Sequence, residues 1–158
     1  MLRKNRTTQT ALSGLRFAMV ASRYNARYVN GLVAAAKAEF RTLGAGLIEV
    51  LRVPGAFEIP MAASELARRV RNRPAAILCL GVIWQGETAH AHHIGEAITQ
   101  ALMQLQMTTG VPCIHEVLLV KDRAQAQARC LTPSTSRGTE AAQTAVAMAN
   151  LLSKIRVK

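Results

Sequence analysis

The segment Gly86-Glu87-Thr88-Ala89-His90 combines residue types that can hold a phosphate group and move a proton. If a helix begins here, its first backbone N–H groups lack partners and carry the positive end of the helix dipole, which favours an anion. Gly86 lets the backbone approach a ligand closely. His90 can exchange a proton near neutral pH. Two interpretations stay open: a phosphate cradle beside a proton carrier, or a glycine turn with a threonine cap and a surface histidine.

A second candidate is the stretch from Val53 to Pro60, in which two prolines and a glycine stiffen a turn between a strand and a helix. This rigidity would present the Glu58 carboxylate to a polar ligand. Glu58 also fits a simple helix entry, where the dipole favours an acid. Tyr24 can stack on a flat heterocycle, and it can equally pack against a neighbouring chain.

Arg129 and the histidines near position 90 are two further candidates for ligand binding. Arg129 lies in an alanine-rich segment typical of a surface helix, and it would bind phosphate only if it faces the Gly86 segment. The histidines at 90, 92 and 93 have poor metal spacing, because only His90 and His93 share a helix face and no third ligand follows. We therefore expect no metal.

Strands and helices alternate along the chain and would position these residues. Apolar runs predict four strands, at Leu15 to Ala21, Leu47 to Val53, Ala75 to Ile83, and Val111 to Leu119. The third run is almost wholly apolar, as expected of a central parallel strand. This alternation predicts an α/β fold with a parallel sheet covered by helices on both faces.

Helix signals separate the predicted strands. Leu32 to Leu43 has helical spacing that Gly44 ends, and a helix from about Pro60 would carry Met61, Leu66 and Val70. Later helices are expected from a Thr88 cap to about Thr109, after an Asp122 cap through Arg129, and from about Arg137 to Ile155. Ligands of parallel sheets bind beyond the carboxyl ends of the strands, where Tyr24, Glu58 and His90 would all fall.

The length of 158 residues suggests one domain, at residues 14–158, after a flexible basic arm at residues 1–13. The arm is not followed by the apolar block of a secretory signal, and no apolar run reaches the roughly 18–20 residues that span a membrane. Cys79, Cys113 and Cys130 lack paired metal spacing, and two of them lie in apolar runs. Buried thiols in a reducing cytoplasm are the expectation.

The formal net charge of +11 raises the possibility of a basic α/β module that binds nucleic acid. The one dense run, from Arg68 to Arg73, falls where a helix should end, and cations there complement the helix dipole. No aromatic residues interleave with these arginines to stack on bases. We therefore expect no nucleic-acid partner, and a basic surface that attracts small anionic substrates.

Taken together, these segments resemble the lumazine synthase family from about Leu15 to Ile155. The most specific pieces are Val53 to Pro60, Gly86 to His90, Gln125-Ala126 followed by Arg129, and Arg137-Gly138-Thr139-Glu140-Ala141-Ala142. The resemblance implies a flavodoxin-like three-layer α/β/α sandwich with a four-stranded parallel sheet. It also implies a transferase that condenses 5-amino-6-ribitylaminouracil with 3,4-dihydroxy-2-butanone 4-phosphate, releasing 6,7-dimethyl-8-ribityllumazine, phosphate and water, without a metal or organic cofactor.

By position, the resemblance assigns His90 as the general acid and base, and Arg129 as the phosphate anchor. It places the backbone N–H groups of Glu87 and Thr88 toward the same phosphate, and Tyr24 against the pyrimidine ring. The uracil and ribityl pocket would be lined by Ala56, Phe57, Glu58, Val82, Ile83 and Trp84. Such chemistry needs proton transfers at each step, which one well-placed imidazole can assist.

Several positions depart from the family pattern: Ala91 and His92 replace an aromatic and an acidic residue, His115 and Glu116 replace Phe-Gly, Leu119 replaces Thr, and Trp84 replaces an aliphatic residue. In the family, the residue at the position of His115 comes from a neighbouring subunit. These departures keep open an alternative, a shell-forming or scaffold paralogue with weakened activity. Family members are homopentamers or larger, up to 60-subunit shells, so we expect at least a pentamer.

Overall fold

The computed structural model describes residue 12 and residues 14–156. The predicted N-terminal arm, at residues 1–13, therefore lies outside the described residues except for Leu12. That side chain is buried in the core. Within the described residues, no helix has both the length and the apolar character needed to cross a membrane.

Among the described residues, four parallel strands form one sheet: β1 (Arg16–Ser22), β2 (Leu47–Val53), β3 (Ala76–Trp84) and β4 (Cys113–Val120). Their spatial order is β2-β1-β3-β4, so β1 and β3 are central and β2 and β4 form the edges. The first seven residues of β3 are all buried, which confirms the prediction of a central strand covered on both faces. Each predicted strand matches an observed one with its ends shifted by two residues or fewer.

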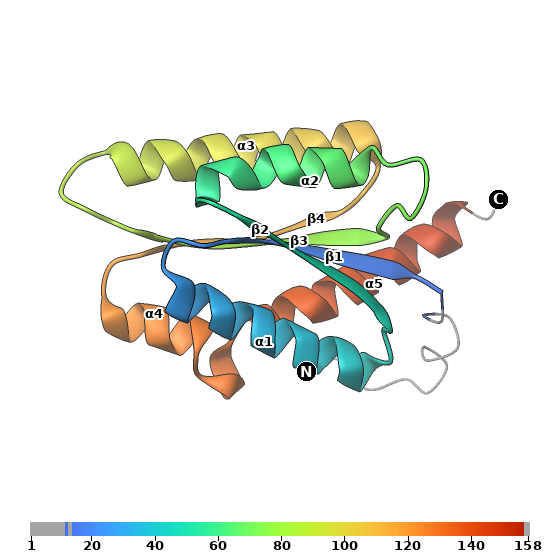
Figure 1. Cartoon of the computed structure of the whole chain (residues 1–158), viewed down its shortest axis with the longest axis horizontal. Coiled ribbons are helices and arrows are strands. Elements are labelled where there is room, and N and C mark those ends of the chain that lie inside the picture. Colours follow the sequence, from blue (N-terminus) through green and yellow to red (C-terminus); the bar gives the residue numbers. More distant parts are fainter. Residues whose placement is uncertain (1–11, 13, 157–158) are drawn as a thin grey trace.

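In the described part of the chain, five α-helices cover the sheet: α1 (Ala26–Leu43), α2 (Ile59–Ala67), α3 (His90–Thr109), α4 (Arg123–Cys130) and α5 (Arg137–Arg156). Two short 3₁₀ turns, η2 (Ala56–Glu58) and η3 (Pro133–Thr135), precede α2 and α5. Helices α2 and α3 lie on one face of the sheet, and α1, α4 and α5 lie on the other (Figure 1). This arrangement is the predicted three-layer α/β/α sandwich with a flavodoxin-like fold.

One hydrophobic core lies on each side of the sheet, and both are built mainly from aliphatic side chains. Alternate residues of the strands feed them, so that Phe17, Met19 and Leu78 pack toward α1 and α5, while Val20 and Ile77 pack toward α2 and α3. Phe17 stacks on Phe40 of α1 with ring centroids 4.9 Å apart. The buried aliphatic surface supplies the main driving force for this fold.

Two glycines bring α1 unusually close to its neighbours α5 and α4. A Cβ atom at Gly138, on α5, would lie 2.2 Å from the backbone oxygen of Leu32 on α1. A Cβ atom at Gly31 would lie 2.5 Å from the backbone oxygen of Cys130, the last residue of α4. The absence of side chains at these two positions therefore fixes how closely the three helices of this layer pack.

The second helix is shorter than the sequence predicted. It ends at Ala67, and of its three expected apolar residues only Leu66 is buried, whereas Met61 is exposed and Val70 lies beyond the helix at 98% exposure. The Arg73 guanidinium provides a reason for this end, because its Nε donates to the Ala67 carbonyl oxygen at 2.6 Å. A helix carbonyl without an intrahelical partner is satisfied in this way.

The arginine run that follows α2 makes contacts with the rest of the protein. Arg69 forms an ion pair with Glu49 of β2, with the closest N···O distance 2.6 Å, and Arg68 donates to Ser64. Arg73 also donates to the carbonyl oxygen of Thr109, the last residue of α3. The prediction that this run marks a helix end is confirmed, and two of its arginines, Arg69 and Arg73, connect this helix end to β2 and α3.

The caps of the later helices match the sequence only in part. Asp122 accepts a hydrogen bond from the Gln125 N–H at 2.7 Å, which confirms it as the N-cap of α4. The prediction that Thr88 caps α3 is wrong, because the helix begins at His90 with Ala89 in the capping position. The Thr88 hydroxyl instead lies 3.5 Å from the His90 N–H, inside the loop that precedes the helix.

Candidate active site

The carboxyl ends of all four strands meet at one edge of the sheet, which is the left edge in Figure 1. Helices α1, α3 and α4 and the turn that leads into α2 all start at this edge, after β1, β3, β4 and β2 respectively. The predicted site residues Tyr24, Glu58 and His90 therefore fall together there, as parallel topology requires.

Asn25, directly after β1, connects two central strands through its side chain. Its Nδ2 donates to the Val82 carbonyl oxygen at 2.6 Å, and its Oδ1 accepts from the Trp84 indole N–H at 2.8 Å. The backbone of Asn25 is left-handed, with φ of 57°, a conformation that asparagine tolerates better than most residues. The edge of Tyr28 packs on the same indole ring, with centroids 5.6 Å apart. These contacts fix Trp84 at the end of β3.

The turn after β2 is closed by its own carboxylate. Glu58 accepts a hydrogen bond from the Gly55 N–H at 2.8 Å, so the side chain folds back over the turn instead of pointing freely outward. A Cβ atom at Gly55 would lie 3.2 Å from the ring of Tyr24, which shows that this exposed ring covers the same turn. Glu58 serves the helix entry that the sequence allowed, and Tyr24 presents its outer face to solvent.

The other predicted pocket residues lie beside this turn at the same edge. Ala56 packs near Gly81 of β3, where an added Cβ atom would lie 3.4 Å from the Ala56 side chain. Phe57 is exposed, and Ile83 is half-buried against the core under α2 and α3. Exposed aromatic rings at Tyr24, Phe57 and Trp84 therefore surround a small backbone platform, a surface suited to a flat polar heterocycle.

The loop from Gly86 to Ala89 leads from β3 into α3 and is exposed to solvent, together with His90. Its start is held to the neighbouring strand, because the Gln85 N–H donates to the Val120 carbonyl oxygen at 2.8 Å. Its end is held by the pair of Gln85 and His92, whose side-chain nitrogens lie 3.0 Å apart. Backbone N–H groups at the start of a 20-residue helix are therefore open to an anion beside the His90 imidazole.

His115 of β4 faces the layer of α2 and α3. Its Nε2 lies 2.9 Å from the Thr99 hydroxyl of α3, and its Nδ1 accepts from the Val117 N–H at 3.3 Å. Burial holds the pKa of this imidazole below its usual value, so the neutral form is favoured. Thr99 lies nine residues beyond His90, roughly 13 Å along the helix axis. Within one chain, His115 is therefore far from a ligand at His90.

Arg129 of α4 lies in the opposite layer from α3 (Figure 1). It lines a cavity of about 330 Å³ together with Leu118, Leu119, Val120, Gln125 and Arg137. Glu116 is 4% exposed and pairs with Arg137, whose Nε and Nη2 donate to its two oxygens at 3.0 and 2.8 Å. Two guanidinium groups thus border one cavity at the end of β4, which can hold an anion.

The structure therefore divides the predicted site residues into two sets. One set lies around the ends of β1, β2 and β3 and includes Tyr24, Ala56, Phe57, Glu58, Val82, Ile83, Trp84, Glu87, Thr88 and His90. The other set is Arg129, beside β4 in the other layer, and His115, which points toward the middle of α3. Within a single chain these two residues do not meet the first set.

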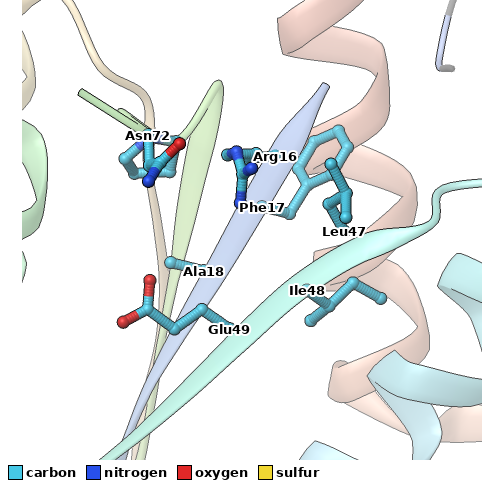
Figure 2. A pocket seen from close by; sticks show the side chains of 8 residues that line it. Arg16, Phe17, Ala18, Leu47, Ile48, Glu49 and Asn72 are labelled. Atoms are coloured by element: carbon cyan, nitrogen blue, oxygen red, sulfur yellow. The ribbon is translucent and has the colours of Figure 1, made fainter. Parts of the chain in front are cut away.

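A second cavity, of about 370 Å³, lies at the other edge of the sheet, beside the amino ends of β1 and β2. Figure 2 shows the side chains of Arg16, Glu49 and Asn72 around it. None of the predicted site residues lines this cavity. Among the described residues, no group of three or more His, Cys, Asp and Glu side chains is arranged to hold a metal ion.

Sequence reasoning did not assign site roles to four residues that the structure places at these positions: Asn25, Gln85, Glu116 and Arg137. Asn25 carried a signal, since it follows directly after a predicted strand and asparagine tolerates left-handed turns. The partners of the other three could not be inferred. Glu116 and Arg137, for example, lie 21 residues apart in sequence and meet only because β4 and α5 pack together.

The sheet order, the layers and the cluster at the carboxyl edge define a flavodoxin-like α/β protein with a ligand site at the strand ends. The family model described as 6,7-dimethyl-8-ribityllumazine synthase matches residues 14–153. The chain belongs to this family.

Curated relatives agree with this assignment. The chain is 40% identical over 139 residues to the 6,7-dimethyl-8-ribityllumazine synthase of Xanthomonas campestris pv. campestris (strain B100), which covers 87% of this chain and 89% of the relative. It is 39% identical over 142 residues to the enzyme of that name from Stenotrophomonas maltophilia (strain R551-3), covering 89% of this chain and 90% of the relative. The family named from the sequence segments is thereby confirmed.

Proposed function

We propose that this protein is the transferase that makes 6,7-dimethyl-8-ribityllumazine in riboflavin biosynthesis. It condenses 5-amino-6-(D-ribitylamino)uracil with 3,4-dihydroxy-2-butanone 4-phosphate. One amine forms an imine with the ketone and releases water, phosphate leaves, and ring closure releases a second water. The observation that carries the proposal is the arrangement at the carboxyl end of β3. Asn25 and Trp84 fix the end of this strand, and the exposed His90 lies directly after it, at the open start of α3.

The chain's own residues suit the demands of this reaction. The His90 imidazole passes protons between the amine, the hydroxyl groups and the leaving phosphate oxygen, a contribution of about 10²–10⁴-fold in typical enzymes. The N–H groups of Glu87 and Thr88 stabilise the phosphate at the helix start. The aromatic surface of Tyr24, Phe57 and Trp84 holds the pyrimidine against the β3 end, and this positioning of two substrates supplies much of the remaining rate.

We further propose that the complete site forms between two copies of the chain. Arg129 and His115 are the two predicted site residues that do not meet His90 within one chain. His115 lies on the edge strand β4, and Arg129 lies on α4, the helix that follows it. A second copy would bring its Arg129 cavity to the phosphate end of the first. This geometry needs at least two copies, and by resemblance to the family we propose a homo-oligomer of at least five subunits. Sedimentation velocity measures whether such oligomers assemble further into shells.

The three cysteines of the chain are free and buried, which agrees with a protein that works in the reducing cytoplasm. The decisive test of the function is to mix the two substrates with the purified protein and to follow the absorbance of the lumazine product. Formation of the product at a rate proportional to protein concentration supports the proposal. A correctly folded oligomer that yields no product would contradict it, and would leave a scaffold role.

A further inference from the structure

In the pair of Glu116 and Arg137, a buried carboxylate occupies the Nε–Nη2 edge of the guanidinium group. Glu116 lies on β4, almost fully buried, while the Arg137 side chain is one third exposed and borders the Arg129 cavity. The carboxylate takes the Nε and Nη2 donors in a bidentate arrangement. This is the arrangement by which a guanidinium binds a carboxylate or a phosphate most strongly.

We propose that Glu116 is an internal competitor of phosphate, a carboxylate that occupies the edge of Arg137 which an incoming phosphate group would otherwise bind. The inference goes beyond the proposed function, and it rests on that function only in taking Arg129 as the anion-binding residue of the cavity. It makes Glu116 an affinity-determining residue that acts through Arg137. The ligand class is a phosphomonoester or inorganic phosphate.

The charges around the cavity support this role. Arg129 and Arg137 supply two positive charges, whereas Glu116 and Glu140, which also pairs with Arg137, supply two negative charges. A phosphate therefore enters a cavity whose cations are already balanced, and it meets the buried carboxylate behind them. Because Glu116 is 4% exposed, water screens its charge less than it would screen a surface carboxylate, so the repulsion of an incoming phosphate is stronger.

The electrostatic influence of Glu116 extends to α4 as well as α5. Burial raises the pKa of the Cys130 thiol to about 11, and the Glu116 carboxylate adds to this rise. Burial also raises the pKa of Glu116 itself, against the opposing effects of Arg137 and Arg129. The groups that face Glu116 are thus Arg137 and Glu140 from α5 and Arg129 and Cys130 from α4.

The alternative is a purely structural pair that joins β4 to the start of α5. A structural pair and a competitor predict opposite results when the carboxylate is neutralised. Loss of a structural pair would lower stability and leave phosphate binding the same or weaker. Neutralising a competitor would remove one negative charge and free at least one of the two N–H donors, so phosphate binding would become tighter.

The test measures the dissociation constant of inorganic phosphate by calorimetry on the assembled wild-type protein and on Glu116→Gln. The expected result is binding tighter by roughly tenfold in the variant, the effect of about one charge-assisted hydrogen bond. Glu140→Gln is the matched control, because it removes one charge from the same arginine and leaves the Nε–Nη2 edge occupied. It should change phosphate binding by much less than Glu116→Gln does.

Two further variants keep the result interpretable. Glu116→Asp retains the charge and should bind phosphate like the wild type. Glu116→Gly should tighten binding as Glu116→Gln does, and it serves if the glutamine variant folds poorly. If both uncharged variants fold and bind phosphate no more tightly than the wild type, the inference is overturned. It is also overturned if Glu140→Gln tightens binding as much as Glu116→Gln does, because net charge alone would then explain the effect.

Catalysis separates this inference from the proposed function. If the protein makes lumazine, Glu116→Gln should lower KM for the phosphate substrate, while kcat falls or stays constant because phosphate leaves more slowly. Lumazine formation without tighter phosphate binding would overturn the role of Glu116 and leave the function standing. Tighter binding without lumazine formation would contradict the function and leave Glu116 as the competitor.

Discussion

The indole N–H of Trp84 donates to the side-chain oxygen of Asn25 at 2.8 Å, across 59 residues of sequence. Because the Asn25 amide also donates to Val82, one side chain fixes both the end of β3 and the orientation of its aromatic ring. Trp84 is the single tryptophan of the chain, so its fluorescence reports on this edge alone.

Replacing Asn25 with a residue that tolerates a left-handed backbone should free the Trp84 ring to move while the turn keeps its conformation. Asn25→Gly removes both hydrogen bonds, and we expect red-shifted Trp84 emission and a KM for the pyrimidine substrate raised about three- to tenfold. Asn25→Asp retains the acceptor for the indole but loses the donor to Val82, so its emission should shift less than that of Asn25→Gly. Identical emission from Asn25→Gly and the wild type would show that the hydrogen bond does not fix the ring.

His90 is expected to carry proton transfer, since it is the exposed imidazole at the start of α3. His90→Ala should lower kcat by about 10²–10⁴-fold with little change in thermal stability. His93→Ala is the matched control, one turn further along the same helix and equally exposed. Steady-state kinetics on both variants decide the matter, and similar rates for the two would remove the special role of His90.

The neutral state of His115 should make stability depend on pH. Burial lowers the pKa of this imidazole in the folded state, so the unfolded chain binds its proton more tightly. The stability that neutral His115 contributes is complete above the usual histidine pKa and is lost as the pH falls through that range toward the folded-state pKa.

Acidification from about pH 7.5 to about pH 5.5 should therefore destabilise the wild type more than His115→Phe, which cannot take up the proton. Urea unfolding of both proteins at several pH values measures the difference. The exposed His93→Phe serves as the control and should follow the wild type. Parallel pH curves for the wild type and His115→Phe would contradict the assignment of a buried neutral imidazole.

The glycine at the start of α5 should tolerate no side chain. Gly138→Ala would place a methyl group 2.2 Å from the Leu32 backbone oxygen, so the two helices must separate. We expect a loss of about 1–3 kcal/mol of folding free energy, as for other overpacked sites, and a lower thermal midpoint. Gly46→Ala, where an added Cβ atom meets nothing within 4 Å, should have little effect at the same protein concentration.

Local patterns predicted the architecture well because each element carried its own signal. The apolar run of β3 and the cap at Asp122 needed no knowledge of distant residues. One prediction failed where a contact between a side chain and the backbone decided the outcome: α2 ends at Ala67, whose carbonyl group accepts from Arg73, and Val70 lies outside the helix. The hydropathy of Val70 alone favoured a longer helix.

The candidate site shows the same division. Order along the chain placed Tyr24, Glu58 and His90 at one edge, because parallel strands end together. The opposite layers of His90 and Arg129, and the pairing of Glu116 with Arg137, follow from how α4 and α5 pack under the sheet. These contacts between helices cannot be inferred from residue spacing, so the sequence identified Arg129 as a candidate but not the residues around it.

The close contact of Gly138 with Leu32 joins the last helix to the first, and it sets the order in which a newly made molecule becomes competent. The loop at Gly86 and the whole of α3 leave the ribosome well before α5 does. Until the 20 residues of α5 emerge, the inner face of α1 lacks its cover and Arg137 is absent from the cavity. Competence to hold phosphate at the Arg129 cavity is therefore acquired only after α5 has been made, when the helix that carries Arg137 docks.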